Sequence, residues 1–253
     1  MILPIPDPDP DPSTIVILRP MKMRDATEYT YKWGEKAVRL AKSLGYNVID
    51  IRKNVVTYDN VTNVIEKYKP RLLVSFSHGC PTSIQGQDEC VITEKIGIDE
   101  LVRMENFRDI VEPLRTSCPG ICEIESNPCE NICFKDTNIN KLKGSIVYAV
   151  ACHSAVQLGK SAIQYGIETY IAYDDLLLFP VDSLNSQDIF GDIHIEMLNG
   201  LLMGQNVRKS VDYMIRLEDA YIRYYKGIKY MALSMLWNKM HFKVLGNDNA
   251  TIY

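Results

Sequence analysis

Short apolar runs alternate with helix-like segments along the first part of this 253-residue chain. The apolar runs near 14–19, 46–52 and 71–77 are typical of buried strands. Between them, apolar residues recur at helical spacing after Ala26, and a shorter helical pattern begins at Asn60 and stops before Pro70. Strands and helices that alternate with short connections favour a mostly parallel sheet with helices on both faces. The sequence therefore predicts an α/β fold.

The alternation breaks at Cys80 and returns near residue 145. Six of the seven cysteines fall in this interval, among short turns that contain Pro and Gly. Apolar runs near 145–151 and 168–174 predict two further strands, and the pattern from about 187 to 243 is mostly helical. The predicted organisation is an extended Pro/Asp arm (1–13), an α/β domain (14–186) with a Cys-rich insertion at about 80–143, and a helical C-terminal extension (187–253) packed on the same domain.

Charge and hydropathy argue against a nucleic-acid-binding, membrane-spanning or secreted protein. The formal net charge is -4 and no basic stripe stands out, which argues against a nucleic-acid partner. The longest uncharged stretch, 144–159, is too short and too polar to span a bilayer. The first residues lack the basic start and long apolar segment of a signal peptide. We therefore expect a cytoplasmic protein without a membrane partner, and the sequence leaves its oligomeric state open.

Two of the apolar runs end in residues that can carry chemistry. "RLLVSFSHGC" ends at His78-Gly79, and "SIVYAVACHSAVQLG" changes from strand to helix pattern at Cys152. In parallel sheets, ligands bind beyond the carboxyl ends of the strands. A cysteine that opens a helix lies where negative charge is stabilised, so its thiolate is favoured. Each motif alone is commonly structural, because buried cysteines pack and a His-Gly pair suits a turn. Their conjunction at two strand ends points to one site.

The parts of this site suit acyl transfer. Cys152 is the candidate nucleophile, His78 is the candidate base, and the backbone N–H groups of Gly79 and Cys152 are candidate donors to an oxyanion. His153 is a rival base, but it follows Cys152 directly and is expected to point elsewhere. His194 and His241 lie in the helical tail, where a structural or exposed role is expected.

The motifs "LLVSFSHG" and "IVYAVACHSA" resemble those of the clan CD cysteine peptidases, which include caspases, metacaspases, gingipains, clostripain, legumain, separase and the CHAT domains. "VACHSAVQLGKSAIQYGIETYIAYDD" is most similar to the gingipain and CHAT end of that clan. Over roughly residues 14–180, the resemblance implies a caspase-like (caspase-hemoglobinase) fold, a peptide or protein substrate, and a Cys152–His78 dyad that needs no cofactor. The spacer between the two motifs is long for the clan, and Val150 stands where metacaspases carry an aspartate.

The resemblance also implies a place for selectivity. In this clan the first specificity pocket lies beside the nucleophile strand, and a buried acid in it selects Arg or Lys. Asp174 and Asp175 end the next predicted strand, so either is a candidate, and a solvated turn or helix cap is an equally good explanation of both. Two rival functions stay open: a catalytically silent scaffold or assembly module with this fold, and a metal-binding or redox protein based on the cysteine cluster.

The cysteine-rich segment has the spacing Cys118-x3-Cys122-x6-Cys129-x3-Cys133. Four thiolates can hold one tetrahedral Zn²⁺ with Zn–S distances of about 2.3 Å, although zinc ribbons usually separate paired ligands by two residues. Two disulfides are the alternative, and free thiols remain open. We expect a cross-link, because residues 116–136 contain few large apolar side chains. Since the insertion enters after His78 and leaves before the nucleophile strand, we also expect it to flank or cover the site.

Overall fold

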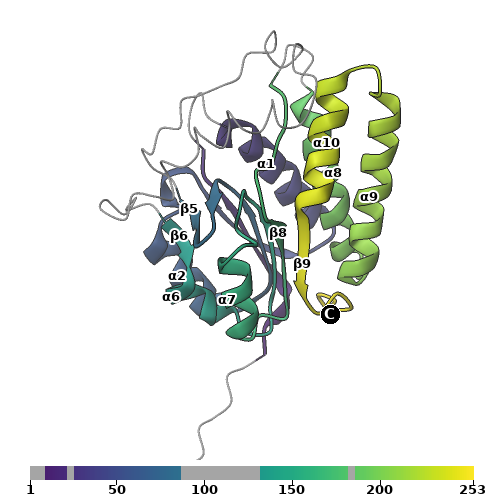
Figure 1. The fold of residues 1–253 in the computed structure, drawn as a ribbon. Coiled ribbons are helices and arrows are strands. Elements are labelled where there is room, and N and C mark those ends of the chain that lie inside the picture. The colour runs from purple at the N-terminus through teal and green to yellow at the C-terminus, as the bar shows by residue number, and fades with distance from the viewer. Residues whose placement is uncertain (1–8, 22–25, 87–131, 182–185) are drawn as a thin grey trace, which may run out of the picture.

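The computed structural model describes residues 9–21, 26–86, 132–181 and 186–253. A six-stranded sheet with the order β2-β1-β3-β7-β8-β9 lies at its centre (Figure 1). Its first five strands are parallel, with their carboxyl ends pointing upward in Figure 1, and β9 runs antiparallel to β8. The strands are β1 (Asp11–Arg19), β2 (Asn47–Arg52), β3 (Pro70–Phe76), β7 (Ile146–Val150), β8 (Thr169–Tyr173) and β9 (Phe242–Gly246).

Helices cover both faces of this sheet. On one face α1 and α8 pack against the strands, with α9 and α10 beside them, and on the other face lie α2 and α7. The long helices are α1 (Thr27–Ser43), α2 (Tyr58–Tyr68), α7 (Leu158–Gln164), α8 (Gln187–Leu202), α9 (Val207–Tyr224) and α10 (Lys229–His241). The short ones are η1 (Lys53–Val55), α6 (Asp136–Ile139) and η2 (Asn140–Leu142). None of the described helices is long and apolar enough to cross a membrane.

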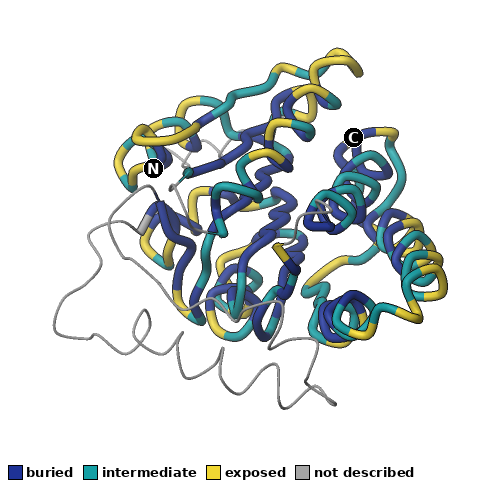
Figure 2. The backbone as a smooth tube through the Cα atoms, turned by 90° about the horizontal axis from the view of Figure 1, so that it is seen from above, coloured by how far each residue is buried: buried dark blue, intermediate teal, exposed yellow. Residues whose placement is uncertain are grey.

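The central strands are buried on both faces, which is why they are continuous apolar runs in the sequence. In β3, Leu72 and Val74 face the core under α1 and α8, while Leu73 faces the core under α2 and α7. Figure 2 shows the same burial as dark blue tube through the middle of the molecule. The predicted mostly parallel sheet with helices on both faces is confirmed.

A second, small sheet joins the ends of the predicted insertion to the main fold. It contains β4 (Gly79–Cys80), β5 (Ser83–Gln85) and β6 (Ile132–Lys135), paired antiparallel in that order. The side chains of Ile84 and Phe134 from this sheet are fully buried in the core under α2 and α7. The expected insertion at about 80–143 is therefore anchored by folded strands at both ends, and its interior, 87–131, lies outside the described residues.

Three boundaries differ from the sequence prediction. β1 begins at Asp11 rather than at residue 14, because the Asp11 N–H donates to Lys69 O at 2.8 Å and extends the pairing. α2 begins at Tyr58 rather than Asn60, because the Thr57 side chain caps it by accepting from the Asn60 N–H. β9 is not predicted by the sequence pattern, and it adds a strand to the otherwise helical C-terminal region. Residues 1–8 of the predicted arm lie outside the described residues.

Candidate active site

The two strand ends that carry His78 and Cys152 are neighbours. β3 and β7 pair in parallel register with Phe76 opposite Val150, and the Ser77 N–H donates to Val150 O at 3.3 Å. His78 and Cys152 each follow two residues after this last ladder pair, so both lie at the same edge of the sheet, beyond the carboxyl ends of β3 and β7.

Gly79 passes directly against the cysteine backbone. A Cβ atom at this position would lie 2.5 Å from the carbonyl oxygen of Cys152 and 2.9 Å from the Cβ of Ala151. Only glycine, which has no Cβ, fits this approach. Steric exclusion therefore explains why glycine occupies the second position of the His-Gly motif. The contact also shows that the chain just after His78 touches the chain at Cys152.

The hairpin that follows orients the Gly79 backbone. His78 O accepts from the Gln85 N–H at 3.0 Å, and Gly79 stands opposite Ile84 in the next pair. In antiparallel ladders, hydrogen-bonded and non-hydrogen-bonded pairs alternate. The Gly79–Ile84 pair is therefore a non-hydrogen-bonded one, and the Gly79 N–H is directed away from β5.

The Cys152 thiol is partly exposed and receives a backbone hydrogen bond. The Leu177 N–H donates to Cys152 Sγ at 3.2 Å. A donor aimed at sulfur favours the thiolate over the thiol. Leu177 was not identified from the sequence, because its contact with sulfur is made by an extended segment that no local pattern reveals.

The prediction that Cys152 opens a helix is wrong. Residues 152–157 form turns, and α7 begins only at Leu158. The turns are held by neighbouring segments: the His153 N–H donates to Asp175 O, and the Ala155 N–H donates to Tyr173 O, both at 3.0 Å. His153 itself has φ +54°, a left-handed conformation that is costly for a residue with a side chain. Strained residues of this kind cluster at functional sites, and here the strain marks the sharp turn after the cysteine.

The histidines of the C-terminal region have structural surroundings. His194 is buried, its Nδ1 lies 2.7 Å from the Tyr148 hydroxyl, and burial lowers its pKa to about 3, so it is neutral near pH 7. His241 Nδ1 lies 2.7 Å from Asp174 Oδ1. His194 lies in α8, and His241 is the last residue of α10, directly before β9.

The two candidate acids differ in their surroundings. Asp174 is bound by His241 on one oxygen and by Lys243 at 3.2 Å on the other. Asp175 is 8% exposed, and its Oδ1 accepts from the Leu176 N–H at 2.8 Å. Since Asp175 O also binds the His153 N–H, Asp175 lies against the turn that carries Cys152.

Of the four cysteines proposed as ligands, only Cys133 belongs to the described residues. It is fully buried in β6, where its thiol donates to the carbonyl oxygens of Ile84 and Gln85 at 3.5 and 3.2 Å. Burial raises its pKa to about 12, so the thiol stays protonated at neutral pH. This environment does not fit a zinc thiolate. Among the residues that the structure describes, no three His, Cys, Asp or Glu side chains are grouped to hold a metal ion.

Comparisons with known proteins bear on the fold. No family model matches the sequence, and no curated protein matches it. The structure is similar to the crystal structure of the Arg-specific cysteine proteinase gingipain R, with a TM-score of 0.53 and 13% sequence identity. The fold is caspase-like. The similarity covers 94% of this chain but 46% of the gingipain chain, so this chain spans less than half of that protein. The comparison does not separate the gingipain end of the clan from the CHAT end.

Proposed function

We propose that this caspase-like chain is a cysteine endopeptidase in which Cys152 and His78 form the catalytic dyad. The observation that carries the proposal is the contact of Gly79 with the Cys152 backbone, at the paired ends of β3 and β7. The likeness to a cysteine proteinase supports it at the level of the fold. The substrate is a peptide or protein, and we retain the cytoplasm as the proposed location.

Each residue has a role in the proposed reaction. The Cys152 thiolate attacks the peptide carbonyl carbon, and the oxygen that becomes negative is bound by the N–H groups of Gly79 and Cys152. His78 takes the thiol proton and gives it to the leaving amine. Water then hydrolyses the acyl-enzyme and restores the thiol. No cofactor takes part in these steps.

The test is cleavage of a peptide library by the wild type and by Cys152→Ala, His78→Ala and Cys133→Ala. Cys133 is a suitable control because its thiol is also bound to backbone groups, but these are the carbonyl oxygens of Ile84 and Gln85 in β5 and not groups of the proposed dyad. We expect the first two variants to lose all cleavage while Cys133→Ala retains it. Undiminished cleavage by Cys152→Ala would refute the proposal.

The rival proposal is a catalytically silent scaffold or assembly module with the same fold. The reactivity of Cys152 toward iodoacetamide distinguishes the peptidase from the scaffold, because an activated cysteine reacts faster than an ordinary exposed thiol. Ordinary reactivity together with no cleavage of any peptide would favour the scaffold.

For selectivity, we propose cleavage after basic residues with Asp175 as the acid. Asp174 is the weaker candidate because its two carboxylate oxygens already bind His241 and Lys243. The structural relative is Arg-specific by name, which supports a basic preference. We expect Asp175→Asn to erase a preference for Arg or Lys and Asp174→Asn to preserve it. A cleavage profile without basic preference in the wild type would contradict this assignment.

For the insertion, we retain the proposal of a cross-link, either disulfides or one zinc ion, among Cys118, Cys122, Cys129 and Cys133. Cys133 is its weakest member, because its fully buried thiol is already bonded to the carbonyl oxygens of Ile84 and Gln85. Two measurements decide between the disulfide and the zinc form. The intact mass rises by about 2 Da per disulfide on reduction, and metal analysis detects bound zinc. The same measurements on Cys133→Ala show whether Cys133 takes part. Free thiols without zinc in the wild type would end the proposal.

A further inference from the structure

The segment of residues 173–178, which we call the thiol-facing segment, continues β8 beyond its last ladder pair. On one side it binds the turn after the cysteine. Tyr173 O accepts from the Ala155 N–H, Asp175 O accepts from the His153 N–H, and the Leu177 N–H donates to Cys152 Sγ at 3.2 Å. The odd-numbered residues therefore direct their backbone groups toward Cys152 and the residues that follow it.

The even-numbered residues bind the other side, at α10 and the start of β9. The Asp174 N–H donates to His241 O at 3.0 Å, and Leu176 O accepts from Trp237 Nε1 at 3.0 Å. Asn238 holds both backbone groups of Leu178: its Oδ1 accepts from the Leu178 N–H at 2.8 Å, and its Nδ2 donates to Leu178 O at 2.7 Å. This alternation is that of an extended strand, in which successive backbone groups point to opposite sides.

Two α10 side chains thus occupy the place of a neighbouring strand. Trp237 and Asn238 are buried at 9% and 3% exposure, so their hydrogen bonds are shielded from water. These hydrogen bonds fix the carbonyl group of Leu176 and both the N–H and the carbonyl group of Leu178. Because these groups flank Leu177, they set the direction of the Leu177 N–H that meets the sulfur.

We propose that Asn238 and Trp237 are positioning residues that hold the Leu177 N–H on the Cys152 sulfur and so maintain the reactive form of the thiol. The inference rests on the proposed cysteine chemistry, but it concerns the reactivity of Cys152 and does not require that any peptide be cleaved. Helix α10 thereby acts on a residue far from it in sequence through three side-chain hydrogen bonds to one segment.

The test is the pH profile of Cys152 alkylation by iodoacetamide in the wild type, Asn238→Leu and Trp237→Phe. Trypsin releases Cys152 in the peptide 144–160, between Lys143 and Lys160, in which it is the sole cysteine, so mass spectrometry reports its modification alone. We expect both variants to be alkylated roughly threefold to tenfold more slowly at pH 7, the scale of one ordinary hydrogen bond, because the Leu177 N–H is misdirected and not removed. Their alkylation midpoints should move to higher pH.

The matched control is Asn138→Leu. Asn138 is an equally buried asparagine that bonds backbone groups at both ends of its amide, Lys135 N and Cys133 O, each at 2.9 Å, but it belongs to the α6 region. We expect it to lower the melting temperature and leave the alkylation profile unchanged. The titratable groups of the thiol-facing segment and those bound to it, Tyr173, Asp174, Asp175, His241 and Lys243, are common to all variants, as is the proposed base His78.

The outcomes separate this inference from the proposed function. Slower alkylation in the Asn238 and Trp237 variants supports the inference even if the wild type cleaves no peptide, in which case only the peptidase proposal fails. If Asn238→Leu does not fold, Trp237→Phe decides, because it keeps an aromatic side chain at this position and lacks the Nε1–H donor. Folded variants with the profile of the wild type would overturn the inference.

Discussion

Gly79 approaches the Cys152 backbone closely, and it supplies the first prediction. In Gly79→Ala, the added methyl group meets the Cys152 carbonyl and the Ala151 side chain, so the chain at Gly79 must move away from residues 151 and 152. We expect a loss of about 1–3 kcal/mol in the free energy of unfolding and a large loss of any cleavage, because the His78 side chain moves with its neighbour. Urea unfolding and peptide cleavage measure the two effects.

Gly227→Ala is the matched control, since a methyl group there meets nothing within 4 Å. It should leave cleavage unchanged and keep or slightly raise stability, as glycine replacement does at a compatible site. Equal effects of the two substitutions would show that the approach at Gly79 is not tight.

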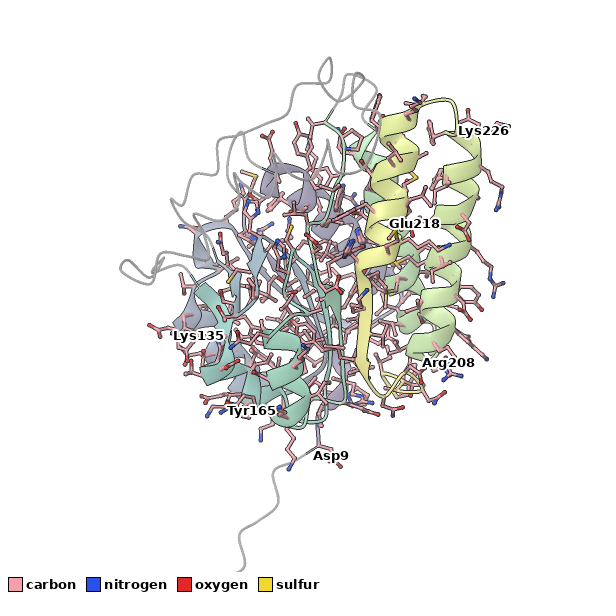
Figure 3. All side chains as sticks on the ribbon, viewed as in Figure 1. Asp9, Lys135, Tyr165, Arg208, Glu218 and Lys226 are labelled. Atoms are coloured by element: carbon pink, nitrogen blue, oxygen red, sulfur yellow. The ribbon has the colours of Figure 1, made fainter. Side chains whose placement is uncertain are left out.

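Glu218 supplies a prediction about pH. This residue of α9, labelled in Figure 3, is 3% exposed, and burial raises its pKa from 4.5 to about 8, with Lys239 opposing and Asp219 adding to the shift. Between these two values the folded chain binds a proton that the unfolded chain has lost. The free energy of unfolding therefore falls as pH rises through this window, by at most roughly 1.4 kcal/mol per pH unit.

Glu218→Gln removes this titration, so its stability relative to the wild type should grow from pH 5 to pH 8 in urea unfolding. His194 has the opposite sign: its lowered pKa makes both proteins less stable as the pH falls below 6.5, and this contribution cancels in the comparison. A constant difference between the two proteins across the window would show that Glu218 titrates normally.

The residues of the candidate site were predictable to different degrees. His78, Gly79 and Cys152 follow apolar runs, and strand ends of a parallel sheet meet at one edge, so their proximity follows from the pattern. Leu177 and Asn238 carry no such signal. They meet the site through an extended segment and a helix from the far end of the chain, and only tertiary packing brings these together.

At the scale of elements, the small sheet changes how the insertion must be tested. Removal of residues 82–140 would delete β5, β6 and the buried side chains Ile84 and Phe134. Gln85 and Ile132 are register partners in β5 and β6, so a short hairpin linker can replace 87–131 alone. Because closing a shorter loop costs less entropy, we expect the fold to persist with a similar or higher melting temperature.

In the same variant, we expect faster alkylation of Cys152 and altered kcat/KM for peptides, because the insertion is attached beside His78. The Cys133→Ala protein with the full insertion is the control. Unaltered alkylation and kinetics in a folded variant would count against a flanking or covering role for 87–131.

The ends of α7 and α10 show why local sequence patterns do not predict every boundary of a helix or strand. α7 begins at Leu158 rather than at Cys152 because His153 adopts a left-handed conformation with φ +54°, which a right-handed helix cannot include. β9 follows α10 without a break, and each residue from Phe242 to Val244 is half-buried, so neither composition nor alternation separates the strand from the helix before it. Pairing with β8 decides its conformation, and that partner lies about 70 positions earlier in the chain.

At the scale of the whole molecule, the C-terminal residues complete the sheet and its core. β9 pairs along β8 from Tyr173–Phe242 to Thr169–Gly246, and beyond it Ala250 and Ile252 are buried at 3% and 1% exposure. Arg71, at the start of β3, donates to Thr251 O and pairs with Glu168 at 2.6 Å, which ties the tail to the centre of the sheet.

A chain that ends at His241 should therefore fail to fold stably. It would expose the edge of β8, uncover the apolar surface beneath Ile252 and leave the half-buried Arg71 without the Thr251 carbonyl, one of its two backbone acceptors. Burial of one such side chain contributes about 1.5–3 kcal/mol, so we expect a loss of at least about 3 kcal/mol when the lost strand is included. Removal of Tyr253 alone is the control, since that residue is 72% exposed and lies beyond the buried positions. Thermal unfolding compares the two chains. If the chain ending at His241 melts at the same temperature as the one lacking Tyr253, the sheet does not depend on its sixth strand.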